Sequence, residues 1–326
     1  MSAPSVNEVH HRATVPPELA GRRLDQALAA LFDDYSRTLL SSWIRDGRVR
    51  LNGRPCKPRD AVANGDAVEL DAVLDACEET AAEAIAFGVV VEDRECIVID
   101  KPAGLVVHPG AGNRTHTLVN GLLHRWPELA ALPRAGLIHR LDKDTSGLLV
   151  VARTPRAFQK LTALLAAREI HRSYQAIVHG VVVAGGSIDA AIARDRQHRT
   201  RMRVSEGGRE ARTHYRVLRK FRAHTLLEIQ LETGRTHQIR VHLQHIGSPI
   251  VGDPDYGTRR RLPPGATPAL REALSGLHRQ ALHACRLEFP HPGGRKMLIA
   301  ESPLPADLAA LLNALAEDDA AHVGPR

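Results

Sequence analysis

The sequence predicts an α+β protein of two domains, in which a mixed, largely antiparallel β-sheet with flanking helices and loops follows a small αβ domain. Three observations carry this prediction. The chain has 326 residues, which is enough for about two domains. An acidic, alanine-rich stretch at residues 71–87 divides it. After that stretch, short strand-like runs of about five residues mix with few helical patterns.

The composition is that of an ordinary globular protein, with 43% hydrophobic and 25% charged residues. The net charge of +7 favours nucleic acid or an anionic surface as partner, unless it reflects only a general preference for arginine. The N-terminus lacks the layout of a signal peptide, and no run approaches the roughly 18 apolar residues of a membrane helix. The four cysteines form no CxxC pair, which predicts reduced thiols. We therefore expect a soluble, cytoplasmic protein.

The first domain is expected at residues 16–75, after a flexible tail at residues 1–15. Apolar residues recur at helical spacing from Leu24 to Phe32, which predicts a helix. Ser36 is a suitable N-cap for a second helix that Gly47 ends, and the apolar face of this helix holds Leu39, Leu40, Trp43 and Ile44. The run VRLNGRPC then predicts a hairpin with Asn-Gly in its turn, and a second Asn-Gly precedes another strand.

Basic residues cluster around the second helix and the hairpin. They are Arg37, Arg45, Arg48, Arg50, Arg54, Lys57 and Arg59. A solvated helix face is the simplest explanation of such a cluster. RNA contact explains it better, because the cluster spans two adjacent elements and contains few acids. A helix pair followed by a basic strand segment resembles the small S4 RNA-binding module.

A linker is expected at residues 76–87, and the second domain at residues 88–326. The strand-like runs are ECIVID, GLVVH, LLVVA, SYQAIVHG, THYRVL and TLLEIQLE. The helical patterns are THTLVNGLL, RAFQKLTALLAAR and a terminal ADLAALLNALA. Residues 259–280 have the pattern of a Pro/Arg-rich loop followed by a helical stretch.

The stretch GLIHRLDKDTSGLLVVA, at residues 136–152, places five polar or charged side chains directly before an apolar run. DTSGL is not the GxSxG of a hydrolase, and it departs from the DTG of aspartic proteases, which also need a second copy. The histidines at 237, 242 and 245 lack HExxH spacing, so no zinc site is predicted. No Walker A or dinucleotide fingerprint occurs.

Two carboxylates of this stretch remain as candidates, Asp142 and Asp144. On an extended segment they would share one face, roughly 6.5–7 Å apart, a separation suited to an inverting glycosidase. That alternative leaves the basic charge and the first domain unexplained. A mechanism with one carboxylate fits better, because a carboxylate buried near a guanidinium stays ionised and can attack a sugar carbon or remove a sugar proton.

These motifs together resemble the RluA-type pseudouridine synthases. HRLDKDTSGLL is similar to the catalytic signature of that family, and SYQAIVHG and LETGRTHQIRVHLQHIGSPIVGDPDYG are similar to two further motifs. DQALAALFDDYSR, LVVHPGAGN and PRAGLIHRLDKDTSG follow in the family's order. The resemblance covers about residues 14–312. NRTHTLVNGLL and the loop at 259–270 depart from relatives, which affects details of RNA contact rather than the reaction.

The resemblance implies an isomerisation that needs no cofactor and no metal. Uracil is cut from C1′ of a uridine in 23S ribosomal RNA, turned and rejoined through C5. Asp142 is implied as the catalytic carboxylate at the sugar, whether it attacks C1′ or removes a proton at C2′. Arg240 is implied as its ion-pair partner, and Tyr174 as the residue that stacks on the base and takes the C5 proton. Arg140 is implied to fill the gap that the flipped base leaves.

The neighbours of Asp142 are expected to have supporting roles. Lys143, Asp144 and His139 are expected to organise the loop rather than to react. The implied partner is large-subunit ribosomal RNA, either free or within an assembling 50S particle, and a monomer is expected. The alternative is an S4-type ribosome-assembly factor without catalysis, which would leave Asp142 and Arg240 unexplained.

Overall fold

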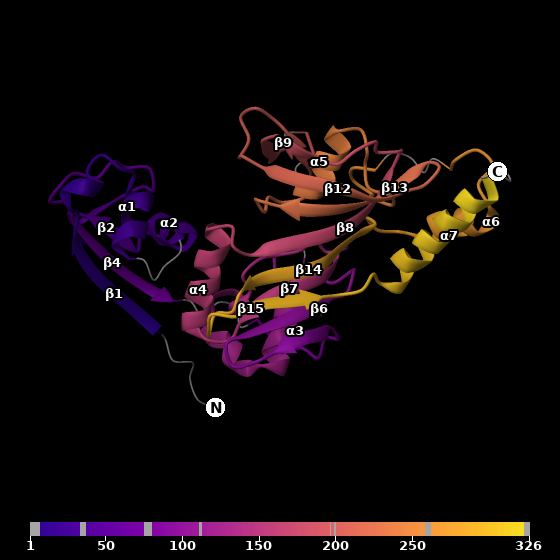
Figure 1. The fold of residues 1–326 in the computed structure, drawn as a ribbon. Coiled ribbons are helices and arrows are strands. Elements are labelled where there is room, and N and C mark those ends of the chain that lie inside the picture. The colour runs from indigo at the N-terminus through magenta and orange to yellow at the C-terminus, as the bar shows by residue number, and fades with distance from the viewer. Residues whose placement is uncertain are drawn as a thin grey trace. The chain divides into compact units, whose positions relative to one another are not determined.

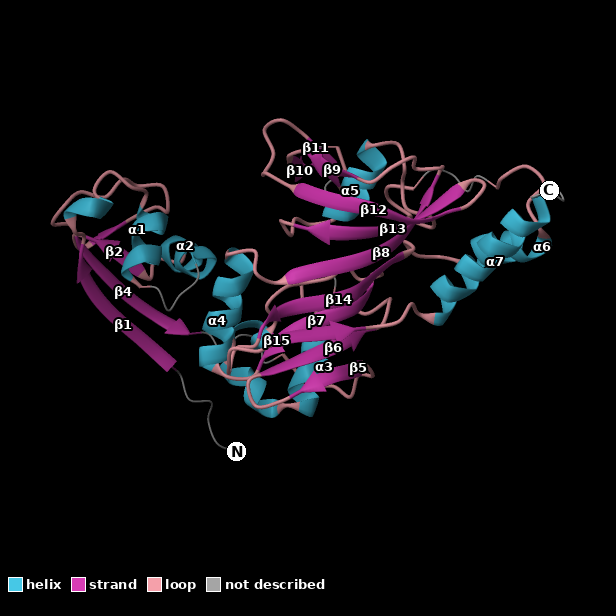
Figure 2. Cartoon of the chain, viewed as in Figure 1, coloured by secondary structure: helices cyan, strands magenta, loops and turns pink. Residues whose placement is uncertain are grey.

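The computed structural model describes residues 7–322 apart from residues 33–36, 75–79, 111–112, 196, 199 and 258–261. The chain divides into two compact units, Met1–Glu79 and Thr80–Arg326 (Figures 1 and 2). Ser36, the predicted N-cap, and Cys77 lie outside the described residues. The other three cysteines are free thiols.

The described part of the small unit contains two helices and a four-stranded antiparallel sheet in the order β1-β4-β2-β3. Its elements are β1 (Asn7–Thr14), a 3-10 helix (Pro17–Leu19), α1 (Leu24–Leu31), α2 (Arg37–Arg45), β2 (Val49–Leu51), β3 (Arg54–Pro55) and β4 (Ala67–Leu74). The predicted helix pair and hairpin are confirmed. Asn52 and Gly53 take φ values of 53° and 73°, as a tight hairpin turn requires.

The expected flexible tail is wrong for residues 7–14, because they form β1. This strand pairs with β4 along its whole length, from Asn7 opposite Leu74 to Thr14 opposite Ala67. Its sequence, NEVHHRAT, has little apolar alternation, and its partner is distant in the chain. Neither feature gives a strand signal that can be recognised from the sequence.

The small unit has a hydrophobic core of its own. Leu24 and Leu28 from α1 and Leu40 and Ile44 from α2 are almost completely buried, in one cluster with residues of the sheet. Burial of each such side chain contributes about 1.5–3 kcal/mol. The helical spacing read from the sequence therefore gives the correct buried faces.

Residues 80–87 have no regular secondary structure and pack against the large unit. Asn120 Nδ2 donates to the Ala81 carbonyl group at 2.7 Å, and Phe87 packs against the main core. The composition thus marks the right region for a boundary, but the last part of the expected linker lies on helix α3 (Leu118–Arg125).

In the described part of the large unit, nine strands form one sheet, in the order β5-β6-β7-β14-β8-β13-β12-β9 with β15 paired to β14 (Figure 1). The pairing of β7 with β14 is parallel and the other pairings are antiparallel. Strands β10 and β11 form a second, two-stranded sheet. The predicted α+β class with a largely antiparallel sheet is confirmed.

The bounds of these elements follow the chain. The strands are β5 (Gly88–Glu92), β6 (Cys96–Lys101), β7 (Ser146–Ala152), β8 (His171–His179), β9 (Gly186–Asp189), β10 (Ile192–Arg194), β11 (Met202–Val204), β12 (Arg212–Lys220), β13 (His224–Leu231), β14 (Leu282–Pro290) and β15 (Met297–Glu301). The remaining helices are α4 (Pro155–Ala166), α5 (Gln238–His245), α6 (Pro268–Gly276) and α7 (Ala306–His322), with 3-10 helices at Pro127–Ala131 and Pro133–Gly136. The run GLVVH is a loop and not a strand, and only Val106 in it forms a bridge, to Thr117.

Strand β7 is buried on both faces because a hydrophobic core lies on each side of it. Leu149 and Val151 belong to the core that includes α3, whereas Leu148 and Val150 belong to the core that includes α4. Cover on both faces explains why this strand has a continuous apolar sequence rather than an alternating one.

The backbone of β7 approaches β14 most closely at Gly147. The φ angle of Gly147 is 114°, and a Cβ atom there would lie 2.2 Å from the carbonyl oxygen of its partner Ala284. Only glycine fits this position. The glycine of DTSGLL therefore lets the preceding loop enter the centre of the sheet.

Candidate active site

A cavity of about 1050 Å³ is lined by the loop before β7, the start of β8 and the segment from the end of β13 into α5. The four residues that the sequence singled out for chemistry all line it, namely Arg140, Asp142, Tyr174 and Arg240. They come from three separate segments of the chain, and the fold brings them together.

Asp142 lies in a tight turn. The Thr145 N–H donates to the Asp142 carbonyl group at 3.1 Å, so this segment is not the extended one that would place Asp142 and Asp144 on one face. The spacing argument for an inverting glycosidase therefore loses its basis. The Lys143 and Asp144 carbonyl groups accept hydrogen bonds from Gly104 N–H at 3.0 Å and from an arginine at 3.4 Å. Both neighbours help to fix the turn through their backbone.

Lys101, at the end of β6, is a fully buried support of this turn. Its Nζ donates to the carbonyl groups of Pro102, Leu105 and Lys143 at 2.8, 2.9 and 2.8 Å. Burial lowers the pKa of Lys101 to about 7, although nearby carboxylates act in the opposite direction. The side chain ties the end of β6 to the turn that carries Asp142.

Arg240, on α5, is 4% exposed and joins three carboxylates. Its Nη1 donates to Asp142 Oδ2 at 3.2 Å. Its Nε and Nη2 donate to Asp253 at 2.7 and 2.9 Å, and Nη2 also donates to Asp255 at 2.8 Å. Burial alone would lower the pKa of Arg240, but the hydrogen bonds and charges of these carboxylates raise it above the ordinary value. Asp142 therefore faces a permanent cation.

Asp253 holds the guanidinium of Arg240 in one orientation. Its carboxylate is fully buried, and Oδ1 also accepts the backbone N–H groups of Asp255 and Tyr256 at 2.9 and 3.0 Å. The Tyr256 ring centre lies 4.9 Å from the Arg240 guanidinium carbon. The segment GDPDY thus forms a rigid cradle that directs Nη1 of Arg240 toward Asp142.

His237 precedes α5 in the left-handed conformation, with φ 56°. The Tyr256 hydroxyl accepts the Met202 N–H at 2.7 Å and lies 2.8 Å from His237 Nδ1, so the hydroxyl donates to Nδ1. The ring proton then resides on Nε2, which lies 3.9 Å from Asp142 Oδ1. Burial lowers the pKa of His237, so the ring is neutral at pH 7.

Tyr174 and Arg172 lie on the same face of β8, two residues apart. Tyr174 is 4% exposed and Arg172 is 8% exposed, and both line the cavity. Burial raises the pKa of Tyr174, although the charge of Arg172 opposes that effect. The phenol therefore keeps its proton at neutral pH.

His139 and Arg140 line the same cavity but differ in burial. Val150 N–H donates to His139 Nε2 at 3.4 Å, and burial, with a smaller effect of Arg172, lowers the pKa of His139 to about 3. The ring is neutral and braces the loop against β7, as expected for a supporting residue. Arg140 is exposed.

The basic residues of the small unit fall into two groups. Arg37 donates to the buried carboxylate of Asp25 at 2.8 and 3.1 Å, so it ties α2 to α1. The other six are exposed and pair with no carboxylate of a described residue: Arg45, Arg48, Arg50, Arg54, Lys57 and Arg59. The second group is a cationic surface available for a ligand, which we call the cationic patch.

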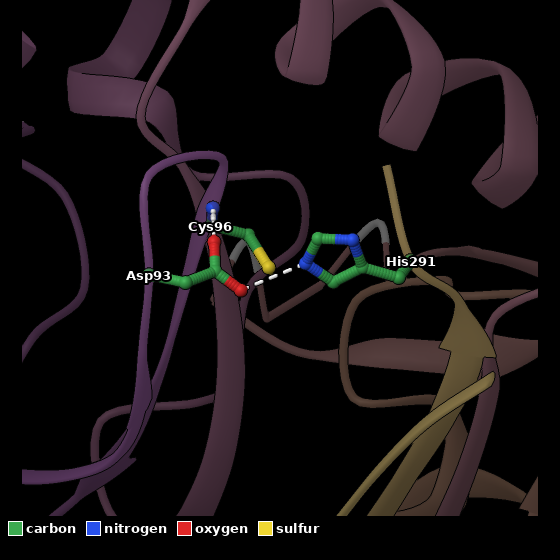
Figure 3. A group of neighbouring side chains, drawn as sticks. All are labelled: Asp93, Cys96 and His291. Atoms are coloured by element: carbon green, nitrogen blue, oxygen red, sulfur yellow. Dashed lines mark hydrogen bonds and ion pairs between the residues drawn. The ribbon is translucent and has the colours of Figure 1, made fainter. Parts of the chain in front are cut away.

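A separate group of side chains, Asp93, Cys96 and His291, has its potential ligand atoms within 4.8 Å of one another (Figure 3). Asp93 Oδ1 accepts the N–H groups of Glu95 and Cys96, and Oδ2 accepts from His291 Nε2 at 2.7 Å. Gly293 N–H donates to the other ring nitrogen of His291. Burial raises the pKa of the Cys96 thiol to about 12. These bonds tie the β5–β6 turn to the chain after β14.

Comparison with known proteins agrees with this geometry. Residues 95–245 match the RNA pseudouridylate synthase family, and residues 22–68 match the S4 domain. Among the described residues, no helix is long and apolar enough to cross a membrane.

The chain is also similar to curated and solved proteins over most of its length. It is 53% identical to ribosomal large subunit pseudouridine synthase D of Xanthomonas campestris pv. campestris, over 95% of this chain and 93% of that protein. It is 51% identical to the protein of the same name from Pseudomonas aeruginosa, over 97% and 99%. The structure of human RNA pseudouridylate synthase domain containing 4 superposes with a TM-score of 0.56 at 28% identity, over 70% of this chain and 93% of that one. The chain therefore belongs to the RNA pseudouridylate synthase family, in the group of the ribosomal large subunit synthases D, as its resemblance to the RluA-type enzymes predicted.

Proposed function

We propose that this protein isomerises uridine to pseudouridine in large-subunit ribosomal RNA, with Asp142 as its single catalytic carboxylate. The observation that carries the proposal is the 3.2 Å contact of Asp142 with Arg240 in a cavity that Tyr174 also lines. The names of the relatives support the choice of RNA, since each is a ribosomal large subunit synthase.

Asp142 acts at the sugar of the target uridine. It attacks C1′, or it removes a proton at C2′, while the bonding electrons of C1′–N1 move to the uracil ring. Both routes need an ionised carboxylate, and the cation of Arg240 favours that form. Uracil then turns and bonds to C1′ through C5, which restores the carboxylate. The isomerisation balances without an oxidant or a reductant.

Tyr174 stacks on the uracil ring and receives the proton from C5. A buried aromatic ring on a rigid strand suits stacking. Because burial raises the pKa of Tyr174, its phenolate is not the resting form. Proton removal from C5 is therefore coupled to release of the phenol proton, and Asp142, once free of the sugar, is a carboxylate in the same cavity that can take it.

Arg140 and the cationic patch act on the RNA rather than on the reaction. A uridine in a folded stem must leave the stack to enter a cavity, and the exposed guanidinium of Arg140 fills the vacated space. The six cations of the patch bind backbone phosphates and supply affinity. We propose that the protein acts as a monomer in the cytoplasm, on free RNA or on an assembling 50S particle.

The test is direct mapping of the product. Ribosomal RNA transcripts are incubated with the protein, treated with carbodiimide and read by primer extension, which stops at modified pseudouridines. We expect new stops at discrete uridines of the large-subunit RNA. Binding to the RNA without any new stop would favour the alternative, a non-catalytic S4-type assembly factor.

A further inference from the structure

Arg172 is a buried cation for which the described residues provide no partner. Its side chain is 8% exposed, and its Nε is buried without a hydrogen bond. It takes part in no ion pair with any described residue. The buried Arg240 and Arg279, in contrast, each bind a carboxylate through two nitrogens. An unpaired buried charge costs folding free energy, so its retention indicates a ligand.

The fold keeps room for the guanidinium of Arg172 at the wall of the cavity. Gly234, in the loop between β13 and α5, lies opposite, and a Cβ atom there would be 2.9 Å from Arg172 Nη1. The φ angle of Gly234 is not in the left-handed region, so its backbone does not require glycine. Absence of a side chain at Gly234 therefore serves the space that Arg172 occupies.

A second unsatisfied donor lies on the same cavity. His139 Nε2 accepts the Val150 N–H, so the ring proton resides on Nδ1, which is buried and has no partner among the described residues. Both His139 and Arg172 line the cavity, and their charges are close enough to interact. This wall of the cavity thus presents hydrogen-bond donors that lack an acceptor.

We propose that Arg172 binds a carbonyl oxygen of the target uracil and stabilises the negative charge that the ring acquires when C1′–N1 breaks. This inference rests on the proposed function. The electron pair of the broken bond passes to N1 and spreads over O2 and O4, and it is used again when C5 bonds to C1′ and loses its proton. The charge arises on uracil whether Asp142 attacks C1′ or removes the C2′ proton.

The location of Arg172 favours the base over a backbone phosphate as its ligand. Arg172 is almost fully buried and lies on the same strand face as Tyr174, the proposed stacking residue. Phosphates are large and hydrated, and exposed cations such as Arg140 suit them better. A preformed donor at a site of developing charge is among the largest sources of rate enhancement.

The test compares Arg172→Met with the wild type on RNA that carries uridine or 5-fluorouridine at the target. Loss of the C1′–N1 bond is measured in a single turnover by nuclease digestion and chromatography. We expect the variant to bind RNA normally and to be about 100-fold slower on uridine. The deficit should shrink to about tenfold or less on 5-fluorouridine, because its more acidic ring needs less help to leave.

Two variants make this comparison specific. Arg172→Lys keeps the charge and should recover part of the rate, and Arg216→Met, on an exposed arginine of β12, should leave both rates unchanged. If Arg172→Met does not fold, Gly234→Ala, which displaces the guanidinium, should show the same dependence on the leaving group. An equal deficit on both substrates, or no deficit, would overturn the inference.

A methylphosphonate next to the target uridine separates the base from the phosphate. If this substitution slows the wild type as much as Arg172→Met does, and slows the variant no further, then Arg172 binds a phosphate and its assignment to uracil is wrong. Failure of the wild type to form pseudouridine would instead reject the proposed function. The two failures are therefore distinguishable.

Discussion

The Arg240 guanidinium lies 3.2 Å from the Asp142 carboxylate, although the two residues are 98 positions apart in the chain. Asp253 makes this contact possible, since it binds the two other donor nitrogens of Arg240 and is itself fixed by backbone N–H groups. The result is a preformed cation beside one carboxylate.

Arg240→Met should lower activity and move the acid limb of the pH–rate profile to higher pH by about one to three pH units, because Asp142 loses the opposite charge that favours its ionised form. The profile of single-turnover rate against pH measures this shift. Arg240→Lys is the control, since it keeps a charge but not the geometry, and it should shift the limb less. An acid limb that stays in place in the Met variant would rule out the pairing as a functional one.

Tyr174→Phe should retain stacking and RNA affinity but should slow or stop product formation by about 100-fold or more, because the C5 proton has no acceptor. An intermediate joined to the RNA should accumulate. Tyr215→Phe, a change to the tyrosine of β12 outside the cavity, serves as the control. Normal turnover by Tyr174→Phe would assign the proton to a different base.

Lys101 should make stability depend on pH. Its folded-state pKa is about 7 and its ordinary value is 10.5, so between these values the unfolded chain binds more protons and wild-type stability rises with pH. Lys101→Met removes this contribution, so the stability of the wild type relative to the variant should increase between pH 7 and pH 9. Urea unfolding at both pH values measures it, with Lys220→Met as the control. An equal difference at both pH values would contradict the lowered pKa.

The cationic patch should govern the salt dependence of RNA binding. Change of its six residues to Gln in the full chain should weaken binding and reduce the slope of log affinity against log salt by about 0.7–0.9 for each phosphate that the protein no longer neutralises. Arg37→Gln should mainly destabilise the small unit, because Asp25 loses one of its two arginine partners. An unchanged slope would mean that the patch is only a solvated surface.

Local patterns predicted those parts of the fold that depend on neighbouring residues. The buried faces of α1 and α2 followed from apolar spacing, and the hairpin turn followed from Asn52 and Gly53. Strand β1 and the loop GLVVH were misjudged, because pairing with a distant strand decides both. The turn at Asp142 was misjudged for the same reason, since carbonyl contacts with remote residues fix it.

The candidate site divides in the same way. Asp142, Arg140, Tyr174 and Arg240 could be named from motifs, and the fold brings all four to one cavity. The supports of these residues were missed. A buried arginine needs carboxylates, so Asp253, in the same motif as Arg240, could have been found by that rule. Arg172 gave no sequence signal, because its importance lies in a partner that the fold does not supply.

Asp142→Asn tests the central claim most directly. Asn keeps the shape of the side chain but can neither attack C1′ nor remove a proton. In a single turnover on ribosomal RNA, mapped by carbodiimide and primer extension, pseudouridine formation should fall by more than about 1000-fold while RNA affinity stays close to that of the wild type. Asp144→Asn, on the neighbouring carboxylate, should remain active. Turnover by Asp142→Asn within about tenfold of the wild type would contradict the account, because Asp142 would then not be the catalytic carboxylate.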